Sequence, residues 1–198
     1  KDRNYKTIFS TNSGGDLVYP RSAIKIFQAV PFINSKAYKK FKLSEKQVAI
    51  SCASHYGEPE HLRVLNDWVI KLKINKSILQ CGIHNPLNLE SSNSLLLKGN
   101  KPHQLHNNCA GKHLGMLSGC LMNNMNLKNY IDINHPYQKL IRKSLEFFTE
   151  CKIKNTQIGV DGCSAPQYAF ALNNIAISMI NLIKHFNENH KYSEEVRM

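Results

Sequence analysis

Hydrophobic residues recur at helical spacing along much of the chain. From Ala23 to about Ile33, the apolar positions predict a helix that is buried along one side and disturbed at Pro31, where proline removes a backbone donor. Pro59 suits the first turn of a second amphipathic helix. The apolar stripe of this second helix consists of Leu62, Leu65, Trp68, Val69 and Leu72.

The remaining pattern mixes helices with short strands. Ser44 and Gln47 have the form of a capping box ahead of an apolar run. Further helices are predicted over residues 114–122, 136–148 and about 167–186, and strands over residues 5–9, 17–19 and 158–160. The asparagine-rich stretches around residues 85–94 and 123–134 are predicted to be surface loops. This mixture indicates an α+β (α/β mixed) domain with helices covering a sheet.

Length and composition favour one domain, residues 1–198, with 42% hydrophobic and 20% charged residues. Neither a signal peptide nor an apolar run long enough to span a bilayer is readable, so we expect a cytoplasmic protein with no membrane partner. The chain opens with Lys1 and ends in a helix-compatible run at Met198. We therefore expect the domain to be incomplete at both termini.

The net charge of +12 raises the possibility of a polyanion partner. Most of the positive residues are lysines spread along the chain, however, whereas arginine usually dominates phosphate and base recognition. We therefore expect no nucleic-acid partner. The six cysteines form no C-x-x-C pair and are expected to be reduced thiols.

Ser22 and Lys25 are three residues apart at the start of the first predicted helix, which places both side chains on one face. A partly desolvated lysine loses its proton more readily and can accept the proton of a serine hydroxyl, which makes the serine a nucleophile. This S-x-x-K spacing occurs in serine acyl-transfer enzymes. The spacing alone also fits Ser22 as a simple helix cap.

Further segments share unusual combinations of small, polar and cysteine residues. With Arg21 to Lys25, they are Cys52 to Glu58, Cys81 to Pro86, Asn107 to His113 and Gly159 to Cys163. In this order they closely resemble the Rhizobium etli type of L-asparaginase, the asparaginase II family, from about Leu17 to Ala176. Two departures are Ala110, where the family usually has serine, and Ile26, where it usually has proline.

The resemblance implies a fold like that of serine β-lactamases, penicillin-binding proteins and serine-dependent glutaminases, with a central sheet covered by helices. It implies hydrolysis of L-asparagine to aspartate and ammonia through an acyl-enzyme, in a homodimer. Ser22 would attack the amide and Lys25 would be its base. Ser54 matches the family's second catalytic serine, and the lysine paired with that serine is expected beyond Met198.

The resemblance also suggests substrate-binding residues. Arg21 is suited to bind the α-carboxylate of an amino acid, although a surface salt bridge is the competing interpretation. Asp161, between glycines, is a candidate for the α-amino group, or it simply forms a turn. His113 could contact substrate, ligate a metal or be structural.

A zinc site is implied by the same resemblance. Cys109 and Lys112 match the family's zinc-binding segment, and the second cysteine ligand is expected beyond the chain end. Cys163 is expected near the metal, as a substitute ligand or as a buried thiol. From spacing alone C-x-x-K does not identify a metal site, because zinc usually takes Cys, His or carboxylate ligands.

Two other functions stay open at this point. A related Ser-Lys hydrolase could act on another amide, such as glutamine or a β-lactam. A non-catalytic derivative could bind an amino acid or a metal without turnover.

Overall fold

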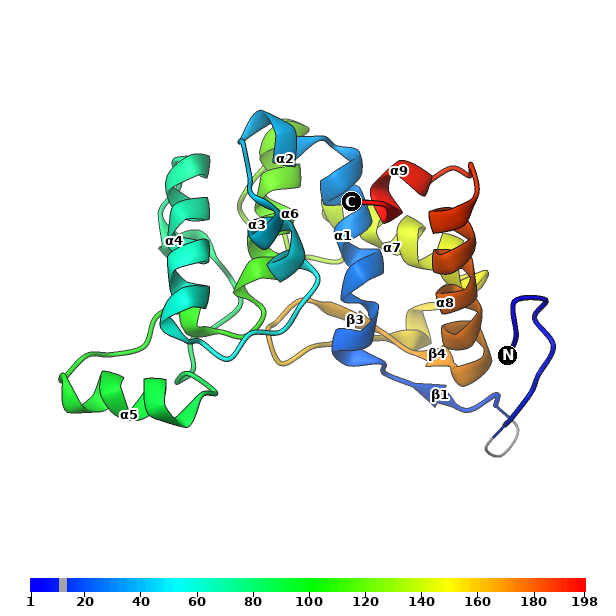
Figure 1. Cartoon of the computed structure of the whole chain (residues 1–198), viewed down its shortest axis with the longest axis horizontal. Helices are drawn as coiled ribbons and strands as arrows, with labels where there is room; N and C mark the ends of the chain where they lie inside the picture. The colour runs from blue at the N-terminus through cyan, green and yellow to red at the C-terminus, as the bar shows by residue number, and fades with distance from the viewer. Residues whose placement is uncertain (11–13) are drawn as a thin grey trace.

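The computed structural model describes residues 1–10 and 14–198 (Figure 1). Its α-helices are α1 (Lys25–Asn34), α2 (Ala37–Lys40), α3 (Glu45–Ser51), α4 (Pro59–Leu72), α5 (Leu89–Leu97), α6 (Ala110–Met122), α7 (Pro136–Thr149), α8 (Leu172–Asn187) and α9 (Ser193–Val196). Short 3-10 helices are η1 (Arg21–Ile24), η2 (Lys76–Ile78), η3 (Gln104–His106) and η4 (Asn155–Gln157).

The strands among the described residues form two small antiparallel sheets. Strand β1 (Leu17–Val18) pairs with β4 (Phe170–Ala171), and β2 (Ile158–Val160) pairs with β3 (Pro166–Tyr168). The predicted α+β class is confirmed. The central sheet and the β-lactamase-like fold stay predictions.

Helix α1 organises the core. It packs against α6 and α7, and Figure 1 shows α4 on one side of it and α8 with α9 on the other. Its residues Phe27 and Phe32 are fully or almost fully buried, and their rings contact Phe148 and Trp68 respectively. These contacts join the two sides of the molecule through one helix. The helix was predicted to be buried along one side, but every residue from Phe27 to Ile33 is buried, because other helices pack around it.

Pro31 lies inside α1 without ending it, so the predicted disturbance is absorbed. Proline has no backbone N–H, and the carbonyl four residues earlier, at Phe27, therefore lacks its usual helical donor. The Ser144 hydroxyl of α7 donates to this carbonyl at 2.7 Å. A buried carbonyl is thus satisfied by a neighbouring helix, and the same hydrogen bond fixes α7 against α1.

Other local predictions are confirmed. Ser44 and Gln47 form both hydrogen bonds of the capping box at the start of α3. Pro59 is in the first turn of α4, and α6, α7, β1 and β2 lie where the pattern places them.

Three local predictions are wrong. Among the described residues, 5–9 form no strand, and the helix predicted from Gln167 begins only at Leu172, because Pro166–Tyr168 and Phe170–Ala171 pair in the sheets. Residues 89–94, at the end of a stretch predicted as loop, belong to α5, whose first turn is capped by the Asn88 side chain.

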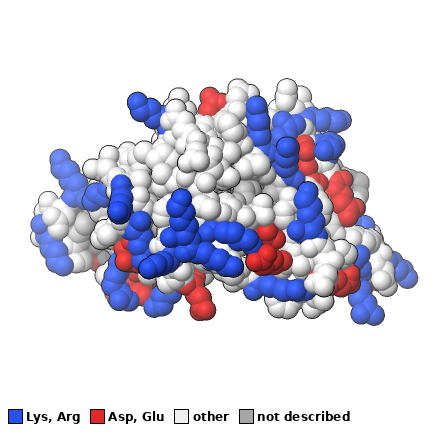
Figure 2. Space-filling model, turned by 90° about the horizontal axis from the view of Figure 1, so that it is seen from above, with Lys and Arg blue, Asp and Glu red and all other residues white. Residues whose placement is uncertain are grey.

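Charged residues are distributed over many elements. Figure 2 shows lysines and arginines across one face, interspersed with acidic and uncharged surface. Within the described part of the chain, no helix has the length and apolar character that crossing a bilayer requires.

Helices α3 and α6 approach each other closely at Gly111. A Cβ atom built on Gly111 would lie 2.3 Å from the Ile50 carbonyl oxygen, whereas one on Gly115 would meet its nearest neighbour, the Ser51 Cβ, at 3.5 Å. Only the absence of a side chain allows α6 to start this near to α3.

We predict that Gly111→Ala lowers the free energy of unfolding by about 1–3 kcal/mol, because the methyl group forces the backbones apart. Gly115→Ala is the matched control on the same helix: it gains helix propensity without a clash and should be neutral or slightly stabilising. Urea denaturation of both variants measures the difference. Equal stabilities would contradict the close approach.

Candidate functional site

The sequence-predicted serines and lysine form one chain of hydrogen bonds. The Ser22 and Ser54 hydroxyl oxygens are 2.9 Å apart, and the Lys25 amine donates to Ser54 Oγ at 2.7 Å and to the Ala53 carbonyl at 3.0 Å. Both serines are exposed, whereas Lys25 has only 1% of its surface exposed. Ser54 therefore lies between the candidate nucleophile and the candidate base.

This arrangement differs from the sequence expectation in one respect. No direct hydrogen bond joins Lys25 to Ser22 among the described residues, and the partner of Ser54 is Lys25, whereas a more distant lysine was expected. Burial lowers the pKa of Lys25 and favours the neutral amine. An uncharged amine has a lone pair, so once the Ser54 hydroxyl turns to donate to it the chain can carry a proton from the exposed serines inward.

Arg21 and Asp161 meet at the same end of α1. The Arg21 Nη2 atom is 3.1 Å from Asp161 Oδ1, and the Arg21 side chain is 67% exposed while that of Asp161 is 8% exposed. Burial alone would raise the pKa of Asp161, but Lys112, the Gly162 N–H and Arg21 together hold it below its usual value. The Asp161 carboxylate is thus ionised at neutral pH and faces the accessible Arg21 guanidinium.

The Arg21 backbone has a φ of 51°. Such left-handed conformations are uncommon for residues other than glycine and are often retained at functional sites. The turn immediately precedes Ser22, so the conformation that positions the guanidinium also positions the candidate nucleophile.

Two buried thiols lie behind this ion pair. One ligand atom each from Cys109, Asp161 and Cys163 lie within 4.8 Å of one another, and the Lys112 amine is 3.1 Å from Cys163 Sγ and 3.6 Å from Asp161 Oδ2. Cys109 and Lys112 come from the start of α6, whereas Asp161 and Cys163 follow β2. The described residues alone therefore supply three candidate metal ligands, in addition to the cysteine ligand expected beyond Met198.

The two thiols interact with each other. This interaction lowers the pKa of Cys109 to about 6 and raises that of Cys163 to about 11, so Cys109 ionises first. Burial of Lys112 would lower its pKa, but the neighbouring sulfur atoms and Asp161 raise it above the usual value. This charge balance is that of a cluster of thiolate, carboxylate and ammonium groups.

His113 is completely buried beside the cluster. Its Nδ1 atom is 2.6 Å from the Tyr130 hydroxyl, which also accepts the Gln80 backbone N–H at 2.9 Å. The tyrosine hydroxyl can then donate its own proton to Nδ1, which places the histidine proton on Nε2. Burial lowers the pKa of His113 and keeps the ring neutral.

Sequence reasoning missed two features of this site. Tyr130 falls in a stretch predicted to be a surface loop, yet it is fully buried and orients His113. Asp161 was predicted to bind the substrate or to form a turn, and the position of its second oxygen beside the thiols was not predicted. The sequence signals were a tyrosine in an asparagine-rich loop and an aspartate two residues before a cysteine.

The family comparison covers the complete chain. Residues 1–198 match the model of the family described as L-asparaginase II. The chain belongs to the L-asparaginase II family. A comparison with curated proteins finds no significant match. Membership identifies an amidohydrolase, with asparagine as the substrate that the family name implies.

In this asparaginase II domain the sequence-predicted residues converge. Arg21 and Ser22 lie in η1, directly before Lys25 at the start of α1, and hydrogen bonds or ion pairs connect these residues to Ser54 and Asp161. The catalytic, substrate-binding and metal-binding roles of these residues stay predictions. The geometry adds which atoms each role would use.

We predict that Tyr130→Phe lowers the free energy of unfolding by about 1–3 kcal/mol, because a partly buried Gln80 N–H and the buried His113 ring both lose their partner. Tyr56→Phe is the matched control, since Tyr56 is 58% exposed. Urea denaturation of both variants provides the measurement. A Tyr130→Phe protein as stable as the control would rule out the proposed role of the hydroxyl.

Proposed function

We propose that the protein is a cytoplasmic L-asparagine amidohydrolase, active as a homodimer, that forms an acyl-enzyme on Ser22. The hydrogen-bond chain from Ser22 through Ser54 to the buried Lys25 is the observation that carries this proposal. An exposed serine connected to a buried amine provides the two requirements of the reaction: access for the amide and a proton acceptor shielded from water.

The proposed reaction begins with attack of Ser22 Oγ on the side-chain amide carbon of asparagine. The Ser22 proton passes to Ser54 Oγ as the Ser54 proton passes to the neutral Lys25 amine, along contacts of 2.9 Å and 2.7 Å. The resulting ammonium returns a proton through the same path to the leaving ammonia. Water then hydrolyses the ester on Ser22 and releases aspartate.

Arg21 and Asp161 provide complementary charges for an amino-acid zwitterion. Their ion pair is only partly buried, with the guanidinium mostly in solvent. We propose that the substrate inserts between them, so that the α-carboxylate binds Arg21 and the α-ammonium binds Asp161. His113 lies deeper, and its Nε2–H has no acceptor among the described residues, which suits a contact to bound substrate.

We further propose a zinc site at Cys109, Lys112 and Cys163, with Asp161 beside it. The residues fit zinc: the two thiols are buried, their sulfur atoms and an Asp161 oxygen lie within 4.8 Å of one another, and the lysine amine already lies within hydrogen-bond distance of Cys163. When bound, zinc would supply a fixed positive charge and connect the start of α6 to the segment after β2. Lys112 would ligate as the neutral amine.

We predict that Ser22→Ala lowers the rate of ammonia release from asparagine by at least about 10³-fold, because no other group replaces the nucleophile. The assay uses Ser77→Ala as control, since Ser77 is an exposed serine outside the site. Release unchanged in Ser22→Ala would contradict the proposed nucleophile.

The same assay separates the alternatives. Ammonia from glutamine but not from asparagine would indicate a related amidohydrolase with another substrate. Asparagine binding without release by the folded protein would indicate a non-catalytic binding function.

For the metal, we predict about one zinc per chain in the purified protein, and its loss in Cys109→Ser and in Cys163→Ser. Cys151→Ser, a thiol outside the cluster, should retain zinc. Elemental analysis after gel filtration measures the content. Zinc retained by both cluster variants would exclude this site.

A further inference from the structure

Helix α5 exposes all of its leucines except Leu95 and directs polar side chains toward the body of the protein. Leu89, Leu96 and Leu97 are 74%, 60% and 89% exposed. Ser91, Ser94 and Lys98, which are three and four residues apart and therefore share the opposite face, line a hollow. A surface helix normally has the reverse orientation, so the polar face requires its own explanation.

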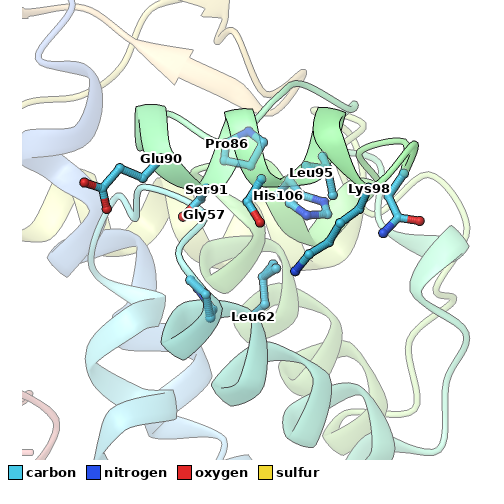
Figure 3. Close-up of a pocket in the computed structure, with 11 residues that line it drawn as sticks. Gly57, Leu62, Pro86, Glu90, Ser91, Leu95, Lys98 and His106 are labelled. Atoms are coloured by element: carbon cyan, nitrogen blue, oxygen red, sulfur yellow. The ribbon is translucent and has the colours of Figure 1, made fainter.

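The hollow has a volume of about 400 Å³, which is the size of a small-molecule site. Pro59, Leu62, Pro86 and Leu95 supply apolar walls, and Gly57 forms part of the floor. Figure 3 shows Leu62 of α4 opposite the α5 residues, with the His106 ring between them. One side is thus apolar and the other side carries hydroxyl, amine and imidazole groups.

His106 offers a buried donor to this space. The residue is 3% exposed, and its Nδ1 atom accepts the His103 backbone N–H at 2.9 Å. A neutral imidazole whose Nδ1 accepts carries its proton on Nε2. No described residue accepts a hydrogen bond from that Nε2–H, and the ring lines the hollow.

Lys98 supplies the positive charge. It forms no ion pair with any carboxylate of residues 1–10 and 14–198, and in Figure 3 its amine reaches back over the hollow toward Leu62. Glu90 lines the far end, with its carboxylate turned away from Lys98. The groups directed into the hollow are therefore mainly donors, which favour an anion.

We propose that this hollow binds a small amphipathic monocarboxylate, with the carboxylate on Lys98 and His106 and the apolar part against Pro59, Leu62 and Pro86. The site is separate from the Ser22–Ser54–Lys25 chain, none of whose residues lines it. The proposal does not depend on the proposed asparaginase activity.

The test is isothermal titration calorimetry of the protein with 3-phenylpropionate and with its neutral amide, 3-phenylpropanamide. The two probes have the same apolar part and differ in charge. We expect saturable binding of the carboxylate at one site, about tenfold or more tighter than the amide. Equal affinities, or no saturable binding of the carboxylate, would overturn the proposal.

Matched variants locate the site. Ser94→Leu should fill the hollow and abolish binding, whereas Asn93→Leu, on the exposed face of α5, should leave it unchanged. Lys98→Gln should reduce carboxylate affinity to that of the amide, and Lys101→Gln should not. Both lysines are exposed, so neither substitution should disturb folding. Their comparison therefore tests the site even if Ser94→Leu folds poorly.

A last control excludes the amidohydrolase site. Excess asparagine should not displace 3-phenylpropionate, because the two ligands occupy different places. Displacement by asparagine, or binding unaffected by Lys98→Gln, would contradict the assignment to this hollow.

Discussion

The buried amine of Lys25 is the constraint on which the site depends. Removing a lysine head group from water costs several kcal/mol unless it is neutralised or hydrogen-bonded, and Lys25 is 1% exposed. The Ala53 carbonyl and Ser54 Oγ satisfy it, at 3.0 Å and 2.7 Å. These bonds hold the segment after α3 against the start of α1, and the same contact that offsets desolvation places the two serines 2.9 Å apart.

A second constraint acts at the start of α6. Gly111 allows this helix to approach α3, and the adjacent residues Cys109 and Lys112 then meet Asp161 and Cys163 beneath the exposed Arg21. Helices α1 and α6 begin close to each other, so the thiol cluster and the hydrogen-bonded serines are neighbours. Their charges interact: the Cys109 sulfur favours the ammonium form of Lys25, whereas burial and Lys112 favour the neutral amine.

Local signals in the sequence predict much of this structure. The capping box at Ser44 and Pro59 in a first turn depend on neighbours in sequence, and both are confirmed. Helix α1 was predicted to be buried along one side, but every residue from Phe27 to Ile33 is buried. The strand pairing of residues 166–171 and the burial of Tyr130 depend on distant partners, so periodicity missed both. For the site, the S-x-x-K motif identified Ser22 and Lys25, but the position of Ser54 between them required the fold.

The most direct test of the central claim is the rate at which an electrophilic asparagine analogue, 5-diazo-4-oxo-L-norvaline, labels Ser22, followed by intact-protein mass spectrometry. If Lys25 acts through Ser54, Lys25→Met and Ser54→Ala should slow labelling by similar factors, and the double variant should be no slower than either one. Independent, multiplicative effects of the two substitutions would contradict the relay, and labelling that persists in Ser22→Ala would contradict the nucleophile itself.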